Sequence, residues 1–236
     1  MNGFWHWFSG RAGPSSGRQA ERLAAWRALP EPDLRALPLE GRFVAVDVES
    51  SGLDISRDRL IAIGAIAVEN SRMATDAGFS VVLRQETASD DDNILVHRIG
   101  ASAQTGGLDP ADALMEFLDY VGKAPLVGYH APFDQAMISN ATRRFLGEPF
   151  RRSWIDLAHL APALCPQQAS DMKDLDDWSG AFGIANFARH NALADAWATA
   201  QLHLVLCSRA AQTSVGTVHE LLETARSQAW LERRRR

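Results

Sequence analysis

Three short runs of Val, Ile, Leu and Phe follow one another between residues 43 and 84, separated by polar turn residues. They are FVAVDVE (43–49), RLIAIGAIAVE (59–69) and AGFSVVLR (77–84), each with the length and β-branched content of a strand. Turn residues such as Ser51-Gly52 make the links between them short, and short links favour antiparallel pairing. The pattern therefore predicts a meander of three antiparallel strands.

Beyond residue 108 the hydrophobic positions mostly follow helical spacing. Asp109 is a plausible N-cap with Pro110 in the first helical turn, and Gly147 is a plausible helix stop. The expected elements are helices over 109–122, 133–147, 171–183, 192–210 and 217–236, a short strand over 124–130, and a strand or helix from 153 that breaks at Pro162. This order predicts an α/β fold with a mixed sheet.

The first forty residues differ from the rest of the chain. A Gly/Ser/Pro linker (9–17) precedes a stretch with helical spacing (18–29), and three prolines then interrupt regular structure. We interpret 1–40 as an N-terminal extension, 41–210 as the main domain, and 211–236 as a C-terminal helix with a basic tail. Trp5, Trp7 and Phe8 in the extension are expected to dock on the domain.

Composition narrows the class of protein. The hydrophobic content of 46% in 236 residues can supply a core, and the apolar runs fall short of the roughly 20 residues that cross a bilayer. With no secretory signal pattern and only Cys165 and Cys207, a cytoplasmic protein without membrane attachment is expected. The net charge of -5 counts against a protein that coats duplex DNA, but not against an enzyme that holds one strand end through cations.

Carboxylates recur where the surrounding sequence is apolar. Asp47 and Glu49 alternate on one strand and must share a face. Asp134 follows the short strand, and Asp195 lies in the first turns of the helix over 192–210; each alone is commonly a capping residue. Clustered together, such charges would cost several kcal/mol unless cations neutralised them. Oxygen ligands favour Mg²⁺ or Mn²⁺, and two such ions about 3.5–4 Å apart serve phosphoryl transfer.

His190 lies five residues before Asp195 at a junction between loop and helix. A lone histidine is more often a cap or a packing residue than a catalytic one, and that reading covers the other histidines. Beside a metal cluster, however, an imidazole is suited to accept a proton from a water molecule. The position of His190 therefore makes it the candidate general base.

Three motifs occur in the order DVESSGL, HAPFD and HNALAD. Together they resemble the DnaQ-like 3′-5′ exonucleases of the DEDDh type, which include proofreading subunits of the polymerase III epsilon kind. The resemblance covers about residues 42–207 and implies an RNase H-like fold, with a mixed five-stranded sheet flanked by helices. The second motif departs from the family pattern, because Ala131 and Pro132 follow His130 where asparagine is usual first.

The resemblance also implies roles for individual residues. It makes Asp47, Glu49, Asp134 and Asp195 the ligands of two divalent cations, Mg²⁺ or Mn²⁺, and His190 the general base. Asn191 stands where the sister class has its tyrosine. Residues implied to contact the terminal nucleotide are Ser50, Ser51, Gly52 and Leu53, with apolar support from Phe133.

The leading hypothesis is a metal-dependent 3′-5′ exonuclease that releases nucleoside 5′-monophosphates from single-stranded or 3′ ends, with DNA slightly favoured over RNA, in replication or repair. Two alternatives remain. One is an idle module that binds nucleic-acid ends or a polymerase, and the other is a phosphodiesterase acting on short oligonucleotides.

Further signals concern partners. QLHLVL (201–206) resembles a peptide that binds sliding clamps, but it lies inside a strongly periodic helix where the leucines are needed for the core. Polymerase or clamp association is therefore a weak expectation. Arginines flank the helix over 133–147 and are candidates for backbone phosphates, although solvated helix ends explain them equally. These arginines are Arg143, Arg144, Arg151 and Arg152.

Overall fold

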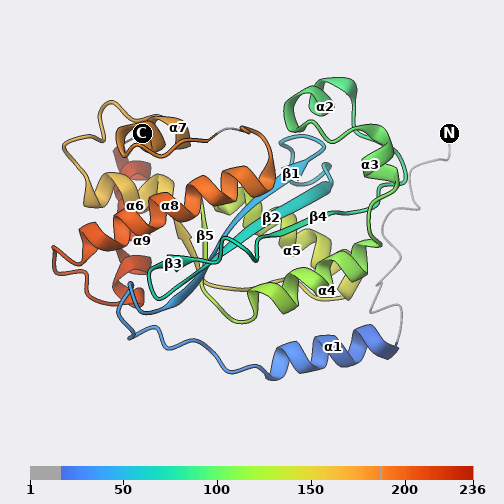
Figure 1. The fold of residues 1–236 in the computed structure, drawn as a ribbon, viewed down its shortest axis with the longest axis horizontal. Helices are drawn as coiled ribbons and strands as arrows, with labels where there is room; N and C mark the ends of the chain where they lie inside the picture. Colours follow the sequence, from blue (N-terminus) through green and yellow to red (C-terminus); the bar gives the residue numbers. More distant parts are fainter. Residues whose placement is uncertain (1–16, 187, 236) are drawn as a thin grey trace.

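The computed structural model describes residues 17–186 and 188–235. Trp5, Trp7 and Phe8, which were expected to dock on the domain, lie outside the described residues. The strands are β1 (Arg42–Ser50), β2 (Leu60–Glu69), β3 (Arg72–Met73), β4 (Phe79–Val82), β5 (Leu126–Gly128) and β6 (Trp154–Asp156). They form one mixed sheet at the centre of the fold (Figure 1).

The strands follow the order β3-β2-β1-β5-β6, and β4 also pairs with β2. β3 and β4 both run antiparallel to β2, at Val68–Glu69 and at Ala62–Ala65, on the edge that β1 leaves free. The six strands thus fill five positions, which confirms the predicted five-stranded mixed sheet. β1 pairs antiparallel with β2 and parallel with β5, and β5 pairs parallel with β6.

Helices cover both faces of the sheet (Figure 1). One face packs against α1 (Gly17–Ala28), α4 (Pro110–Val121) and α5 (Pro132–Leu146), and the other against α6 (Leu157–Leu164), α8 (Ala192–Ala210) and α9 (Val218–Arg235). Val44, Val46 and Val48 of β1 join the first hydrophobic core, whereas Phe43 and Ala45 join the second. By this alternation Asp47 and Glu49 lie on the face covered by α8.

Three further helices are short: α2 (Asp91–His97), α3 (Ala101–Thr105) and α7 (Leu175–Ala181). The sequence pattern did not predict α2 and α3, because polar contacts organise them. The Nδ1 atom of His97 accepts a hydrogen bond from the Ile99 N–H at 3.0 Å, and its Nε2 lies 3.2 Å from the hydroxyl of Ser89. Such a network leaves no hydrophobic periodicity in the sequence.

The predicted break at Pro162 is wrong, since α6 continues through that residue to Leu164. Proline removes one backbone donor and crowds the preceding turn. Burial of Leu157, Leu160 and Ala161 in the second core offsets this cost in a helix of only eight residues.

Helix α1 packs against α4 and the end of α5 through an aromatic anchor. The indole of Trp26 donates to the Gly122 carbonyl at 2.9 Å, and its ring lies 6.1 Å from that of Phe150. The Lys123 ammonium sits over the same indole, 3.8 Å from its centroid. Arg27 adds a bidentate pair with Glu148, with N–O distances of 2.9 and 2.7 Å. These contacts fix α1 beside the α5–β6 connection.

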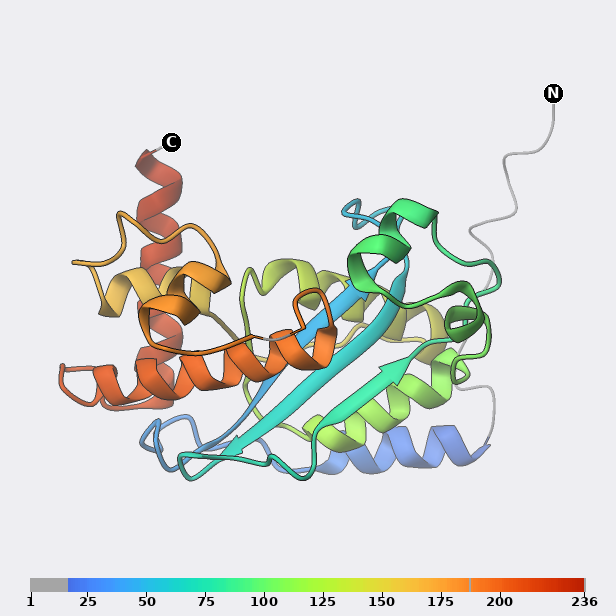
Figure 2. The same ribbon diagram turned by 45° about the horizontal axis from the view of Figure 1, so that its top comes forward.

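The start of α8 approaches the sheet at Gly64, which is paired with Asp47 across β1 and β2. A Cβ atom at Gly64 would overlap the backbone of Ala192 and Leu193. Only glycine therefore lets the first turn of α8 rest on β2. Figure 2 shows α8 lying along the sheet, with its first turn close to β1 and β2.

We expect the substitution Gly64→Ala to lower stability by about 1–3 kcal/mol, because the added methyl group forces α8 away from the sheet. The matched control is Gly180→Ala in α7, where an added Cβ meets nothing within 4 Å. That change should be neutral or stabilising by up to about 1 kcal/mol. Thermal unfolding measures both; equal midpoints for the two variants would contradict the close α8 contact.

Candidate active site

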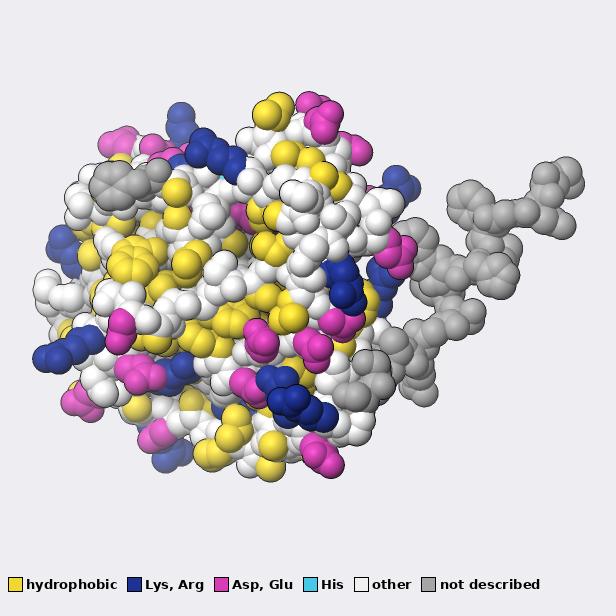
Figure 3. Space-filling view, turned by 45° about the vertical axis from the view of Figure 1, so that its right-hand side comes forward, with side chains coloured by type: hydrophobic (Ala, Val, Ile, Leu, Met, Phe, Trp, Pro, Cys, Tyr) yellow, Lys and Arg dark blue, Asp and Glu magenta, His cyan; other side chains and the backbone are white. Residues whose placement is uncertain are grey.

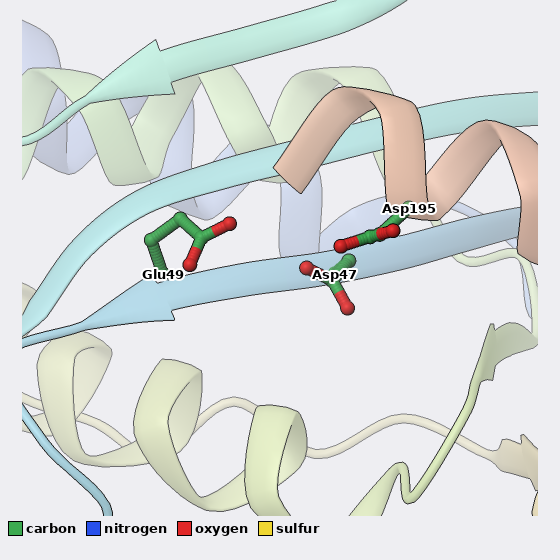
Figure 4. A group of neighbouring side chains, drawn as sticks. All are labelled: Asp47, Glu49 and Asp195. Atoms are coloured by element: carbon green, nitrogen blue, oxygen red, sulfur yellow. The ribbon is translucent and has the colours of Figure 1, made fainter. Parts of the chain in front are cut away.

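Three carboxylates meet where β1 passes under the first turn of α8. Asp47 and Glu49 project from the same side of β1, and Asp195 points to them from α8 (Figure 4). One oxygen from each lies within 4.8 Å of the others. Asn191 caps α8 by accepting from the Ala194 N–H at 3.1 Å, which sets Asp195 in the first turn. Strand alternation and helix capping thus bring the three acids together.

Asp134 lies at the start of α5, next to this cluster but oriented differently. It is buried, and its Oδ1 accepts a hydrogen bond from the Val48 N–H at 3.1 Å. The three-acid cluster therefore does not include it, although the charge of Asp134 is the strongest of those that raise the pKa of Asp47. The structure brings three predicted acids together and holds the fourth against the backbone between Asp47 and Glu49.

Burial and mutual repulsion make these carboxylates hard to ionise. Burial raises the pKa of Asp47 well above its ordinary value, and the neighbouring charges of Asp134, Asp195 and Glu49 raise it further. Burial, with a contribution from Asp195, raises the pKa of Glu49 to about 7. Burial also raises the pKa of Asp134, against the lowering effect of its backbone hydrogen bonds. The site therefore calls for added positive charge.

The donor set fits a hard divalent cation. All the clustered ligand atoms are carboxylate oxygens, the type that Mg²⁺ and Mn²⁺ prefer. The Oε1 atom of Glu49 is buried and has no hydrogen-bond partner within the described part of the chain. An unpaired buried carboxylate oxygen is costly by itself, and a cation bound there would remove the cost.

Two residues that the sequence analysis missed also contact Asp195. The side-chain amide of Asn186 donates to its Oδ1, and the Nε of Arg189 lies 3.6 Å from the same oxygen. The Nη1 atom of Arg189 forms an ion pair with the carboxylate of Asp176 in α7. Arg189 lowers the pKa of Asp47 and so supplies part of the missing positive charge. The only sequence signal was an arginine directly before the third motif.

His190 adopts a left-handed backbone conformation with φ of 58°. In this conformation its N–H donates to Oδ2 of Asp195 at 2.9 Å. The residue as a whole is exposed. The backbone thus ties His190 to a cluster acid while the residue remains accessible from solvent, which suits a group that exchanges protons.

The loop after β1 is held by its own polar groups. The hydroxyl of Ser50 donates to the Gly52 carbonyl at 2.6 Å, and that of Ser51 donates to Asp58 at 2.9 Å. A Cβ atom at Gly52 would overlap the Asp58 carboxylate, so a larger residue there would displace Asp58 from its contact with Ser51. Leu53 is 86% exposed. Ser50, Ser51 and Gly52 therefore frame the loop, and Leu53 presents an apolar side chain to solvent.

Asp58 is a third residue that the sequence analysis missed. Its carboxylate accepts hydrogen bonds from the Ser51 hydroxyl and from the Asp54 N–H at 2.8 Å. Two neighbouring helices also hold the loop through side-chain amides. Asn93 of α2 donates to the Ser51 carbonyl at 2.7 Å, and Asn140 of α5 donates to the Ile55 carbonyl at 3.1 Å. Helix α2, unforeseen from sequence, thus supports the predicted substrate loop.

The unusual second motif has a simple structural role. Ala131 is buried at the N-cap of α5, and Pro132 occupies the first turn, where its missing N–H costs nothing. Phe133 is half-buried and packs against the first hydrophobic core. Ala131 and Pro132 are therefore compatible with the start of α5 at this point, which places Asp134 in its first turn.

Two expectations about partners can be compared with the described structure. The segment QLHLVL lies inside α8, where Leu202 and Leu206 are fully buried, so it is not available as an extended clamp-binding peptide. Within the described residues, no helix combines the length and apolarity needed to cross a membrane.

Comparison with known proteins identifies the family of this chain. The exonuclease family of the RNase T type matches residues 44–203. The epsilon subunit of DNA polymerase III from Aquifex aeolicus is 26% identical over 166 residues, which cover 70% of this chain and 80% of the relative. A PolC-type DNA polymerase III from Thermotoga petrophila is 26% identical over 179 residues, 74% of this chain but only 13% of that relative.

Solved structures support the fold. Exonuclease I of E. coli in complex with a dT13 oligonucleotide has a TM-score of 0.62 and 21% identity, covering 72% of this chain and 42% of that one. The chain thus corresponds to less than half of Exonuclease I and to a small part of the PolC-type polymerase. The matched region contains the acidic cluster, and the chain belongs to the RNase T/DnaQ-like exonuclease family, in keeping with its similarity to the epsilon subunit of DNA polymerase III.

Proposed function

We propose that this protein is a metal-dependent 3′-5′ exonuclease of the DEDDh type. It hydrolyses phosphodiester bonds at single-stranded or 3′ ends, releases nucleoside 5′-monophosphates, and acts on DNA somewhat better than on RNA. The observation that carries the proposal is the cluster of Asp47, Glu49 and Asp195, with its unpaired buried oxygen, inside the region that matches the family.

The proposed cofactors are two divalent cations, Mg²⁺ or Mn²⁺, held by Asp47, Glu49, Asp134 and Asp195. By the resemblance to the family, Asp47 would contribute to the binding of both; the charges of the other three acids raise its pKa. Asp134 keeps one oxygen on the Val48 N–H, which leaves its second oxygen for a cation. When bound, such ions neutralise charge on the phosphate and lower the pKa of water.

His190 is the proposed general base, and its imidazole takes the proton of the attacking water. Its backbone bond to Asp195 keeps it at the edge of the cluster. Asn191, where the sister class has tyrosine, caps α8 and leaves this role to His190. The exposed side chain of Leu53 packs against the base of the terminal nucleotide. The backbone of Ser50, Ser51 and Gly52 lies near the 3′ hydroxyl of that nucleotide. Phe133 supports the start of α5 from the core.

The nature of the relatives supports a nucleic-acid substrate and a role in replication or repair. The matched relatives are parts of DNA polymerase III, and the similar Exonuclease I structure holds a dT13 oligonucleotide. Association of this chain with a polymerase is a further part of the proposal, and it requires a surface other than the buried leucines of α8.

Activity can be measured on matched 5′-labelled DNA and RNA oligonucleotides with Mg²⁺ or Mn²⁺. We expect stepwise shortening from the 3′ end, faster on DNA, with mononucleotides as products. His190→Ala should lower the rate by about 10²–10⁴-fold, the range for loss of a general base. Asp47→Asn should abolish it, because a cation ligand is lost. The control is His219→Ala, an exposed histidine at the start of α9, which should keep the wild-type rate.

If wild type and Asp47→Asn both stay at background with either metal, the protein is not a nuclease on these substrates. Binding of the oligonucleotides without cleavage would then favour an idle module that holds nucleic-acid ends.

Metal-free stability should depend on pH through Glu49. The unfolded carboxyl ionises near 4.5 and the folded one near a pKa of about 7. Because the folded state holds its proton longer, stability falls as pH rises from 4.5 to 7, by up to about 3 kcal/mol, and stays lower above. Thermal unfolding in EDTA should show this fall, and Mg²⁺ should raise the midpoint more at pH 8 than at pH 5.5.

Glu49→Gln removes the ionisable group, so its midpoint in EDTA should change less between pH 5 and pH 8 and exceed that of wild type at pH 8. Glu116→Gln, on the exposed side of α4, should keep the wild-type slope. A Glu49→Gln slope equal to that of Glu116→Gln would show that Glu49 is not the source of the pH dependence.

A further inference from the structure

Two cavities lie beside α5, the helix whose first turn carries Asp134. The first, about 960 Å³, lies between the β5–α5 connection, β6, α6 and α9. The second, about 510 Å³, lies between α5 and the connection from α5 to β6. Gln135 lines both, so the two cavities meet at this residue of α5, and we call them together the α5 groove. It begins at His130 and Pro132, in the loop that leads to Asp134.

The α5 groove extends away from the cluster along one face of α5. Gln135, Ser139 and Arg143 line the second cavity at a spacing of four residues, which places them in one row. Eight residues of helix span about 12 Å. At the rise of about 3.4 Å per nucleotide of a duplex strand, that length covers at most roughly three phosphates, and fewer of a more extended single strand. The second cavity is therefore long enough for about two phosphates of a strand whose end lies at the cluster.

The second cavity carries an excess of positive charge. Arg143 and Arg151 line it and are exposed, whereas the side chain of Arg152 is only 8% exposed. The sole acid in its lining is Glu31, which binds Arg152 at 3.1 and 2.8 Å and lies 3.8 Å from the Lys123 ammonium. Two cations therefore already balance Glu31, and the guanidinium groups of Arg143 and Arg151 remain to attract an anion. In a chain of net charge -5 this local excess favours a phosphate.

The first cavity has a different character. Tyr129, Trp154 and Trp178 contribute aromatic surface to it. Its carboxylate on β6, Asp156, already accepts from the His130 N–H at 2.9 Å and the Ala158 N–H at 3.1 Å. The carboxylate on α9, Glu232, lies 3.0 Å from Nδ1 of His159. Lys173, Arg226 and Arg233 also line this cavity, and Arg226 pairs with Glu223 at 2.7 Å. The aromatic walls suit stacked bases, and the cations can bind the phosphates between those bases.

We propose that the α5 groove binds the single-stranded substrate upstream of the bond that is cut. Bases occupy the first cavity, and backbone phosphates bind Arg143 and Arg151 in the second. This inference rests on the proposed function. Two of its walls lie outside residues 44–203, namely α9 and the segment that carries Glu31. The preference for strand length is therefore set partly by segments that this chain adds to the family domain.

Figure 3 shows a face of the molecule on which Lys and Arg side chains lie interspersed with Asp and Glu side chains. A matched control comes from two arginines that line neither cavity. Arg35 and Arg72 are both exposed. Arg72 lies on β3 and pairs with Glu69 of β2, which in turn pairs with the first residue of β1. Glu49 of the acidic cluster lies near the opposite end of β1. The double variant Arg35→Gln/Arg72→Gln removes the same charge as Arg143→Gln/Arg151→Gln but leaves the α5 groove intact.

The test measures two quantities for wild type and both double variants. Binding of a 5′-labelled dT12 in EDTA is followed by fluorescence anisotropy from 50 to 200 mM KCl. Hydrolysis with Mg²⁺ is followed on DNA of 2, 3, 4, 6 and 12 nucleotides. We expect Arg143→Gln/Arg151→Gln to weaken dT12 binding on the order of tenfold at 50 mM KCl and to reduce the salt slope by about 1.4, the value for two phosphates of a single strand.

On the length series, wild-type kcat/KM should rise until the strand reaches the second cavity. The groove variant should lose that rise and keep wild-type kcat/KM on the dinucleotide, whereas the control variant should follow wild type throughout. Wild-type dT12 affinity in the groove variant, equal losses at every length, or a wild-type rate independent of length would overturn the groove. If wild type cuts nothing but the groove variant alone loses dT12 affinity, the exonuclease proposal fails and the groove stands.

Discussion

The central constraint on the structure is a group of four carboxylates that lie close together and are largely shielded from solvent. Asp47 and Glu49 share one face of β1, Asp195 faces them from α8, and Asp134 lies buried beside the strand. Arg189 balances only part of this charge. Such an arrangement costs several kcal/mol in desolvation and repulsion unless cations are bound. The stability contributed by the two hydrophobic cores on either face of the sheet must offset that cost. The packing of these cores also fixes the elements that carry the carboxylates, so the carboxylates stay close together.

The same packing gives the site its form. Gly64 lets the first turn of α8 reach the sheet, so Asp195 and the backbone of His190 arrive at the cluster together. Asp58 and helix α2 fix the neighbouring loop from which Leu53 projects. On the other side, α5 extends from Asp134 towards the arginines of the α5 groove. The cluster and the loop thus meet at the end of β1, and the proposed α5 groove would lead away from them along α5.

Much of this arrangement was predictable from the sequence, because short-range rules decide it. Strand alternation puts Asp47 and Glu49 on one face, and helix capping puts Asp195 in a first turn. The sequence could not show that the carboxylate of Asp134 turns to the Val48 N–H, or that Arg189 reaches Asp195. These contacts, the polar helices α2 and α3, and the packing of α9 on α6 arise from tertiary structure, which leaves no periodic signal along the chain. The continuation of α6 through Pro162 is a further case in which burial outweighs a local rule.

The central claim is that the buried carboxylates form a binding site for divalent cations. Calorimetric titration of the metal-free protein with Mn²⁺ at pH 8 tests it directly, with Asp47→Asn as the matched variant. The account predicts saturable binding to wild type that disappears or weakens by at least an order of magnitude in Asp47→Asn, since that substitution removes the charge of the acid at the centre of the cluster. Equal binding by the two proteins, or none by wild type, would contradict it.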